Sequence, residues 1–294
     1  MSAERSPATG KRYGIERVCG ITGYPRSTFY SKQTESKVKR RKRGPKPLIT
    51  DERLLELVKE DLARSPFSGE GYRKVWARLK YGRGFRISRK RVLRVMREHN
   101  LLSPYRRPQG EPNLHTGEII TKTPNEIWGA DGTKVFTLED GYTWIFTAVE
   151  HWNGECVGVH VSRKGDRFAA MEPVLMGISS QFGPPGRDVA RGLSLRMDHG
   201  SQYLSDHFQR QIKFFGIAPS SAFLREPETN GVAERFFRTL KEQIIYGKTF
   251  KDAAELREVV MEFVERYNRE WRLEKLGFKS PLEARRAFEV NLAA

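Results

Sequence analysis

Three acidic residues stand at positions from which their carboxylates can act together. Asp198 follows a short apolar run, and Glu234 lies just inside a helical pattern, with 35 residues between them. A third acid, Asp131, lies upstream in another strand-like segment, IWGADGTKV. Divalent cations such as Mg²⁺ prefer oxygen ligands, which Asp and Glu supply and His or Cys do not. Three acids on separate elements therefore predict a site that holds divalent metal against phosphate.

Each acid taken alone has a more ordinary explanation. An Asp after a strand is usually a turn residue, and a Glu near an Arg on a helix usually forms an i, i+4 salt bridge. It is the combination at these positions that favours a shared site. Four other acids compete for the role, but two flank a proline in a loop, one ends a strand and one lies in the first turn of a helix. They are Glu226, Glu228, Glu150 and Asp206.

The segments around these acids predict an α/β fold. Turns at Asp140-Gly141 and Asn153-Gly154 are strong hairpin signals and indicate three antiparallel strands. Helices and strands then alternate, which predicts a mixed sheet with helices on its faces. The expected strands cover 126–138, 142–152, 155–162, 193–197 and 217–223, and the expected helices cover 167–182, 205–215 and 230–246. Sites in open α/β sheets lie beyond the carboxyl ends of strands, so Asp131 can reach Asp198 if the first strand lies beside the fourth.

The helix that carries Glu234 also carries basic residues on the same side. Positions i+4 and i+7 return to one face of a helix, and from Glu234 these are Arg238 and Lys241. An acid followed by two cations fits a metal ligand with phosphate-binding groups beside it.

The positive charge is concentrated in the first part of the chain. The net charge is +17, and residues 1–110 carry 29 Lys/Arg against 10 Asp/Glu, whereas residues 111–294 carry 24 against 26. Solubility alone does not require segregated charge. The distribution indicates a module that binds a polyanion, followed by a separate working domain.

Two features of the basic part are typical of nucleic-acid binding. The first is a basic run in which seven of ten residues from Lys37 to Lys46 are Lys or Arg; its central residues are Lys39, Arg40, Arg41, Lys42 and Arg43. The second is the last of three helices expected over 50–103, which follows a Ser88 cap. We expect its outer face to be basic and without acidic partners at i±4, which fits a DNA-contacting helix; a merely solvated face is the alternative. That face comprises Arg89, Lys90, Arg91, Arg94 and Arg97.

Cysteine and apolar content set the expected environment. Cys19 and Cys156 lie far apart, so neither a disulfide framework nor a thiolate zinc site is expected. No apolar run approaches the length of a membrane span and no secretory apolar region begins the chain, which predicts a soluble, intracellular protein.

The motifs around the three acids resemble those of a known family. W-x-x-D at 128–131, D-x-G-S-Q-Y at 198–203 and N-G-x-x-E-R-F-F-R-T-L-K at 230–241 resemble the catalytic core of DDE-type insertion-sequence transposases and retroviral integrases. GYRKVWARLK and SRKRVLRVMREHNLLSP resemble the helix-turn-helix before this core. The chain departs from the commonest family pattern at Gly129-Ala130, where Thr usually precedes the Asp, and at Thr229, where Asp usually precedes the Asn.

The resemblance implies an RNase H-like core with Asp131, Asp198 and Glu234 as catalytic and metal-binding triad. It implies two Mg²⁺ ions, replaceable by Mn²⁺, and a transposase that cleaves element ends and transfers the 3′-hydroxyl strand into target DNA. Terminal repeats and target DNA are the expected partners, with at least a dimer on DNA, in the bacterial cytoplasm at the nucleoid. The alternatives are a non-enzymatic DNA-binding repressor or architectural protein, and an RNase H-like nuclease without strand transfer.

The expected domain organisation follows from these segments. It comprises a short helix-turn-helix-like segment (1–36), a basic linker (37–49), a helix-turn-helix domain (50–103), a Pro-rich linker (104–118), an integrase-like core (119–247) and a helical tail (248–294).

Overall fold

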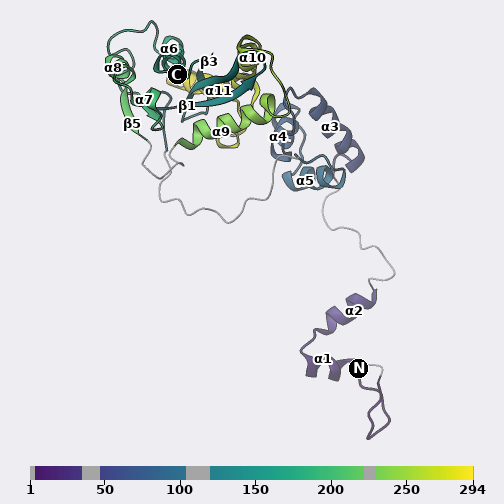
Figure 1. Ribbon diagram of the computed structural model, residues 1–294. Helices are drawn as coiled ribbons and strands as arrows, with labels where there is room; N and C mark the ends of the chain where they lie inside the picture. Colours follow the sequence, from purple (N-terminus) through teal and green to yellow (C-terminus); the bar gives the residue numbers. More distant parts are fainter. Residues whose placement is uncertain (1–3, 35–46, 104–119, 222–229, 294) are drawn as a thin grey trace. The chain divides into compact units, whose positions relative to one another are not determined.

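The computed structural model describes residues 4–34, 47–103, 120–221 and 230–293 (Figure 1). They belong to two compact units, 1–49 and 50–294. The basic run Lys39–Arg43, the Pro-rich linker 104–118 and the acids Glu226 and Glu228 lie outside the described residues.

The first unit contains the two short helices expected from the sequence. They are α1 (Ile15–Thr22) and α2 (Arg26–Thr34). Gly23 ends α1 with a positive φ of 65°, a conformation in which glycine is favoured because it has no Cβ. Arg26 then returns to Glu16 in an ion pair of 3.0 Å, which joins the two helices.

The second unit opens with the expected three helices. They are α3 (Asp51–Arg64), α4 (Tyr72–Ala77) continued by a π-helical turn η1 (Arg78–Gly82), and α5 (Arg89–Glu98). Thr50 and Ser88 cap α3 and α5, each accepting a hydrogen bond from a backbone N–H three residues later, at 3.2 and 3.3 Å. The apolar stripes that predicted these helices are buried, with Leu54 and Leu79 fully enclosed.

A five-stranded mixed sheet forms the centre of the remaining part of the second unit. Its strands are β1 (Ile127–Thr137), β2 (Gly141–Glu150), β3 (Cys156–Ser162), β4 (Ser194–Met197) and β5 (Ala218–Ser221). Their order is β3-β2-β1-β4-β5, with the first three antiparallel and β1, β4 and β5 mutually parallel. The first strand therefore lies beside the fourth, which is the condition that Asp131 needs to reach Asp198.

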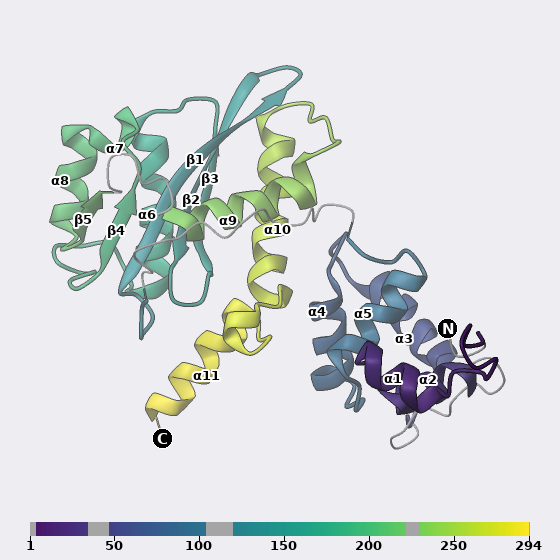
Figure 2. The ribbon, with the colours of Figure 1, turned by 90° about the horizontal axis from the view of Figure 1, so that it is seen from below.

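Helices cover both faces of the sheet (Figure 2). On one face lie α6 (Arg167–Gln181), a short α7 (Ser201–Leu204) that the sequence did not predict, and α8 (Asp206–Phe214). On the other lie α9 (Gly231–Leu240), continued by a π-helical turn η3 (Lys241–Ile245), and α10 (Ala253–Glu270). Alternate residues of the strands face the two layers, so Phe146 enters one core and Ile145 the other.

The helix α10 completes the second core. Its residues Val260, Phe263 and Val264 pack against Phe236 and its neighbours in this core. At 18 residues, α10 is the longest helix among the described residues. Neither it nor any other helix in that part of the chain is long and apolar enough to cross a membrane.

The chain ends with η4 (Glu274–Leu276) and α11 (Pro281–Ala293), and a buried ionic network fixes α11 to the sheet. Arg285 donates through Nε to Glu155 Oε2 at 2.5 Å, and its Nη2 lies 3.8 Å from Glu150 Oε2. Asn153, in the β2–β3 turn, donates to Glu155 at 3.1 Å and to the carbonyl of Pro281 at 3.1 Å. The tail is thus tied to the same hairpin whose first strand lies against β1.

Replacing Arg285 by Ala is expected to destabilise the protein strongly. The side chains of Glu150 and Glu155 are 0% and 5% exposed, so the change leaves two buried carboxylates without their cation. Breaking such a pair costs about 3–5 kcal/mol in the free energy of unfolding. Urea denaturation measures the change. The exposed neighbour Arg286→Ala is the matched control, and an equal effect of both variants would show that the network contributes nothing.

Candidate active site

Asp131 and Asp198 occupy equivalent positions on neighbouring parallel strands. The last pair in the β1–β4 register is Gly129 with Arg196. Asp131 lies two residues beyond Gly129, and Asp198 lies two residues beyond Arg196, directly after β4 ends. Because residues two apart on a strand share a face, the register places both acids beside each other where the strands separate.

Glu234 comes to the same place from a helix. It lies in the first turn of α9, where an acid is favoured by the helix dipole, and α9 packs on β1 and β2. The side chain is exposed, and no ion pair with Arg238 forms in the described structure. Among the described residues, Glu234 therefore does not form the i, i+4 salt bridge that would be its ordinary role on a helix.

The three carboxylates act on one another electrostatically. Burial is the main cause that raises the pKa of Asp131 to about 6, and the charges of Asp198 and Glu234 raise it further. A hydrogen bond from the N–H of Gly132 to Asp131 Oδ1, at 2.7 Å, and the charge of Lys241 act in the opposite direction. The structure thus places Asp198, Glu234 and Lys241 within electrostatic range of Asp131.

The donor set fits a hard divalent cation. In the described parts of the chain, no group of three or more His, Cys, Asp or Glu side chains is already arranged at ligand distances. The charges of Asp198 and Glu234 nevertheless act on Asp131 and are offset only in part by Lys241 and the Gly132 N–H, and all the donor atoms are oxygen. Such a set attracts Mg²⁺ or Mn²⁺ rather than a thiolate-binding metal.

Asn230 links the helix of Glu234 to the strand of Asp131. It stands at the N-cap of α9 but does not cap that helix; its Nδ2 donates instead to the carbonyl of Ala130 at 3.1 Å. A Cβ at position 129 would lie 2.5 Å from Asn230 Oδ1 and 3.2 Å from His151 Nε2, so this contact needs glycine there. Sequence reasoning missed this role, although Asn230 and Gly129 both lie in the quoted motifs.

Most of the basic residues predicted on α5 have acidic partners. Arg91 and Arg94 both pair with Asp51 at the start of α3, at 2.7 and 2.6 Å, and Arg89 pairs with Glu274 at 2.9 Å. The expectation that no acid lies at i±4 is wrong, because Glu98 pairs with Arg94 at 2.9 Å.

Two of the five predicted positions on α5 remain as accessible cations. Lys90 and Arg97 are exposed, and neither forms an ion pair within the described ranges. Arg238, on α9, is likewise exposed.

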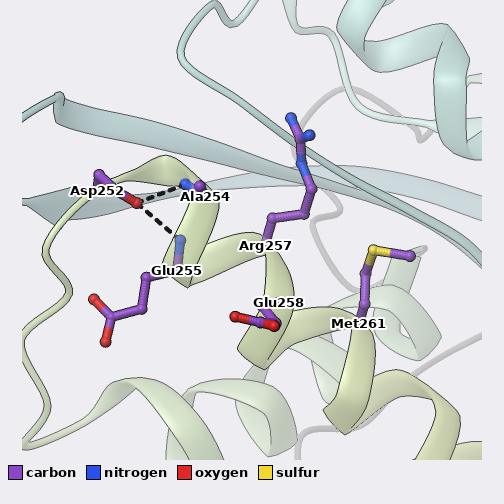
Figure 3. Close-up of a pocket in the computed structure, with 6 residues that line it drawn as sticks. All are labelled: Asp252, Ala254, Glu255, Arg257, Glu258 and Met261. Atoms are coloured by element: carbon purple, nitrogen blue, oxygen red, sulfur yellow. Dashed lines mark hydrogen bonds between the residues drawn. The ribbon is translucent and has the colours of Figure 1, made fainter.

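A surface depression of about 520 Å³ at the start of α10 is unrelated to the three acids (Figure 3). It is lined by Asp252, Ala254, Glu255, Arg257, Glu258 and Met261. The Asp252 carboxylate accepts hydrogen bonds from the N–H groups of Ala254 and Glu255 at 2.9 and 2.8 Å, so it serves as the helix cap. Asp252 therefore has a structural role as the cap of α10.

Comparison with known proteins identifies the family. An HTH-like domain matches residues 50–109, and integrase core domains match residues 121–223 and 215–281. The transposase InsD of the Escherichia coli insertion elements IS2A/D/F/H/I/K is 30% identical over 231 residues, covering 75% of each chain. The chain belongs to the insertion-sequence transposase family. The InsD transposase of IS2-9 from Escherichia coli K12 has the same identity and covers 73% of that protein. This assigns a DDE-type polynucleotidyl transferase with an integrase core and supports transposase activity.

Solved structures with a similar core include retroviral integrases. The catalytic core domain of BIV integrase matches with a TM-score of 0.43 and 19% identity, covering 58% of this chain and 99% of that one. The HTLV-2 integrase catalytic core in complex with magnesium matches with a TM-score of 0.38 and 19% identity, covering 55% and 97%.

Replacing Asp131 by Asn is expected to stabilise the metal-free protein near pH 7. The folded-state pKa of about 6 lies above the unfolded value of 3.8, so the stabilising contribution of this group is present below pH 4 and is lost as the pH rises through 6. The neutral amide removes this penalty, which corresponds to about 1–3 kcal/mol. Thermal melts at pH 4 and pH 7 measure it.

The control is Asp206→Asn, which changes an exposed acid in the first turn of α8. If Asp131→Asn melts at the same or a lower temperature than the unmodified protein at pH 7, the ionised Asp131 carboxylate carries no penalty in the folded protein.

Proposed function

We propose that Asp131, Asp198 and Glu234 are the catalytic and metal-binding residues of this transposase, which cleaves DNA at element ends and joins the freed 3′-hydroxyl to target DNA. The observation that carries the proposal is the β1–β4 register, which puts Asp131 and Asp198 at equivalent positions where two parallel strands separate, with Glu234 in the first turn of the helix that packs on β1. Structural turn residues and surface salt bridges do not converge in this way.

The chain's own residues prepare the reaction by holding charge and position. The carboxylates provide oxygen ligands, and backbone N–H groups of Gly132 and Gly200 hold one oxygen each of Asp131 and Asp198. Lys241, whose charge acts on Asp131, is a proposed contact to a DNA phosphate. When bound, two Mg²⁺ or Mn²⁺ ions supply Lewis-acid activation and stabilise the charge of the departing oxygen. A water or a 3′-hydroxyl is the nucleophile, so no covalent protein–DNA intermediate is required.

The helical module 50–103 is proposed to bind DNA through α5. Lys90 and Arg97 are available directly. The pairs of Arg89, Arg91 and Arg94 are partly exposed, and such pairs contribute only about 0–1 kcal/mol, so DNA phosphate can replace the carboxylates. The basic run Lys39–Arg43 and Arg238 are further proposed phosphate contacts.

The proposed assembly contains terminal repeats, target DNA and at least two copies of the chain, because two element ends must be joined. We place it in the bacterial cytoplasm at the nucleoid. The proposed division of labour is a helix-turn-helix domain (50–103), an integrase-like core (119–247) and a helical tail (248–294), preceded by the segment 1–36 and joined by the linkers 37–49 and 104–118.

Replacing Asp198 by Asn or Glu234 by Gln is expected to abolish strand transfer while DNA binding survives. Each change removes a metal ligand with little change in shape. Losing about 3 kcal/mol or more of transition-state stabilisation lowers the rate by about 100-fold or more. The assay uses the full chain, Mg²⁺ and a pre-cleaved element end.

The matched control is Glu242→Gln, in the π-helical turn η3 that continues α9. Strand transfer retained by either triad variant contradicts the proposal. Cleavage of an uncut end without joining of the pre-cleaved end by the unmodified chain identifies a nuclease instead.

The double variant Lys90→Ala, Arg97→Ala is expected to weaken DNA binding at every sequence to a similar extent. Removing one cation that binds a phosphate lowers the slope of log affinity against log salt by about one. Titrations at several salt concentrations measure the slope. The exposed Lys59 of α3, replaced by Ala, is the control, and an unchanged slope in the double variant would exclude α5 as the phosphate-contacting face.

A further inference from the structure

Three buried polar side chains beside the start of α9 carry atoms that have no hydrogen-bond partner. They are His151, Arg196 and Asn230, which are 6%, 7% and 5% exposed. The atoms are His151 Nε2, Arg196 Nε and Asn230 Oδ1, and none of them is hydrogen-bonded within the described parts of the chain. Buried polar atoms are almost always bonded, either directly or through an ordered water, so three such atoms together need an explanation.

Gly129 brings two of these atoms to one point. A Cβ at position 129 would lie 2.5 Å from Asn230 Oδ1 and 3.2 Å from His151 Nε2, so both atoms border the space that the missing side chain leaves. The histidine is held there from its backbone, because its N–H donates to the carbonyl of Ile127 at 3.0 Å. The two atoms nevertheless do not bond to each other.

Strand alternation places Arg196 on the same side of the sheet. It is the register partner of Gly129, and its neighbours Leu195 and Met197 belong to the core on the opposite face. The Arg196 side chain therefore lies on the α9 face, as position 129 does. Its charge also acts on His151: burial is the main cause that lowers the pKa of this histidine to about 4, and Arg196 lowers it further. The imidazole is therefore neutral near pH 7.

The chemistry of the three atoms fits one water molecule. Arg196 Nε can only donate, Asn230 Oδ1 can only accept, and a neutral imidazole accepts through one of its nitrogens. A water that accepts from the arginine and donates to the other two has three partners, which is the usual number for a buried water. An anion fits less well because Asn230 presents its oxygen, and a metal ion fits less well because the guanidinium is positively charged.

We propose that these three side chains bind one ordered water that fixes the start of α9 to the sheet. His151 is thereby a positioning residue for Glu234. The inference rests on the proposed metal-binding role of Glu234. Asn230 Nδ2 donates to the carbonyl of Ala130, the residue before Asp131, and Glu234 follows in the first turn of α9. Whatever orients Asn230 therefore sets where Glu234 lies relative to Asp131.

The first test is the affinity of the full chain for Mn²⁺, measured by electron paramagnetic resonance in His151→Leu and His151→Gln. Leu removes the polar atom, whereas the amide of Gln can reach the place of Nε2. Groups that orient a metal ligand typically contribute about 10–100-fold to metal affinity, so His151→Leu is expected to lose affinity in that range and His151→Gln to recover most of it. Both variants are expected to bind DNA like the unmodified chain. A histidine that only fills space would give the reverse order, because Leu suits an apolar site better than Gln.

The matched control is His160→Leu. His160 in β3 is paired with Phe146, so it lies on the α6 face of the sheet, and its replacement is expected to leave Mn²⁺ affinity unchanged. Mn²⁺ affinity of His151→Leu within twofold of the unmodified chain overturns the inference alone. Unchanged Mn²⁺ affinity in Glu234→Gln overturns the proposed role of Glu234 as well.

A crystal structure of the unmodified, metal-free chain tests the water site without any substitution. It is expected to show one water within hydrogen-bond distance of His151 Nε2, Arg196 Nε and Asn230 Oδ1. Electron density without this water, or a direct bond between two of the three atoms, overturns the inference even if His151→Leu does not fold.

Discussion

The parallel pairing of β1 with β4 is the constraint on which the site depends. The pairing stops at Gly129 and Arg196, and two residues further along each strand comes an aspartate. A shift of this register by one residue would turn one acid to the opposite face of the sheet. The third acid is placed relative to the same strand, because Asn230 joins the start of α9 to Ala130, the residue before Asp131.

The convergence of three acids carries an electrostatic penalty that the fold offsets only in part. Backbone N–H groups of Gly132 and Gly200 each donate to one aspartate, and Glu234 lies at a helix N-terminus. The pKa of Asp131 nevertheless stays raised to about 6. The carboxylates repel one another when no cation is bound, and a bound cation relieves this repulsion. Such a local cost to stability is expected where function requires concentrated charge.

Local signals made much of this predictable from the sequence. Asp-Gly and Asn-Gly turns mark the hairpins, and caps at Thr50 and Ser88 mark two helices. Interactions between distant segments were not predictable in this way: Arg94 meets Asp51 from 43 residues away, and Arg89 meets Glu274 from 185. Neither partner is visible in the periodicity of α5.

The same limit applies to the details of the site. Gly129 was only a departure from the usual family pattern in the sequence, whereas in the fold it is a steric requirement of Asn230. Only tertiary packing shows that the hydroxyls of Tyr203 and Thr147 are buried. Strand order is likewise a tertiary property. The sequence could therefore not predict that β1 lies beside β4, and the meeting of Asp131 with Asp198 depended on that adjacency.

The most direct measurement of the central claim is cleavage of the polypeptide by hydroxyl radicals generated at Fe²⁺ bound in place of Mg²⁺. If Asp131, Asp198 and Glu234 share one metal site, the fragments end near these three residues, and excess Mg²⁺ suppresses all three cuts together. Cuts near a single acid, or cuts that Mg²⁺ does not suppress, would contradict the account.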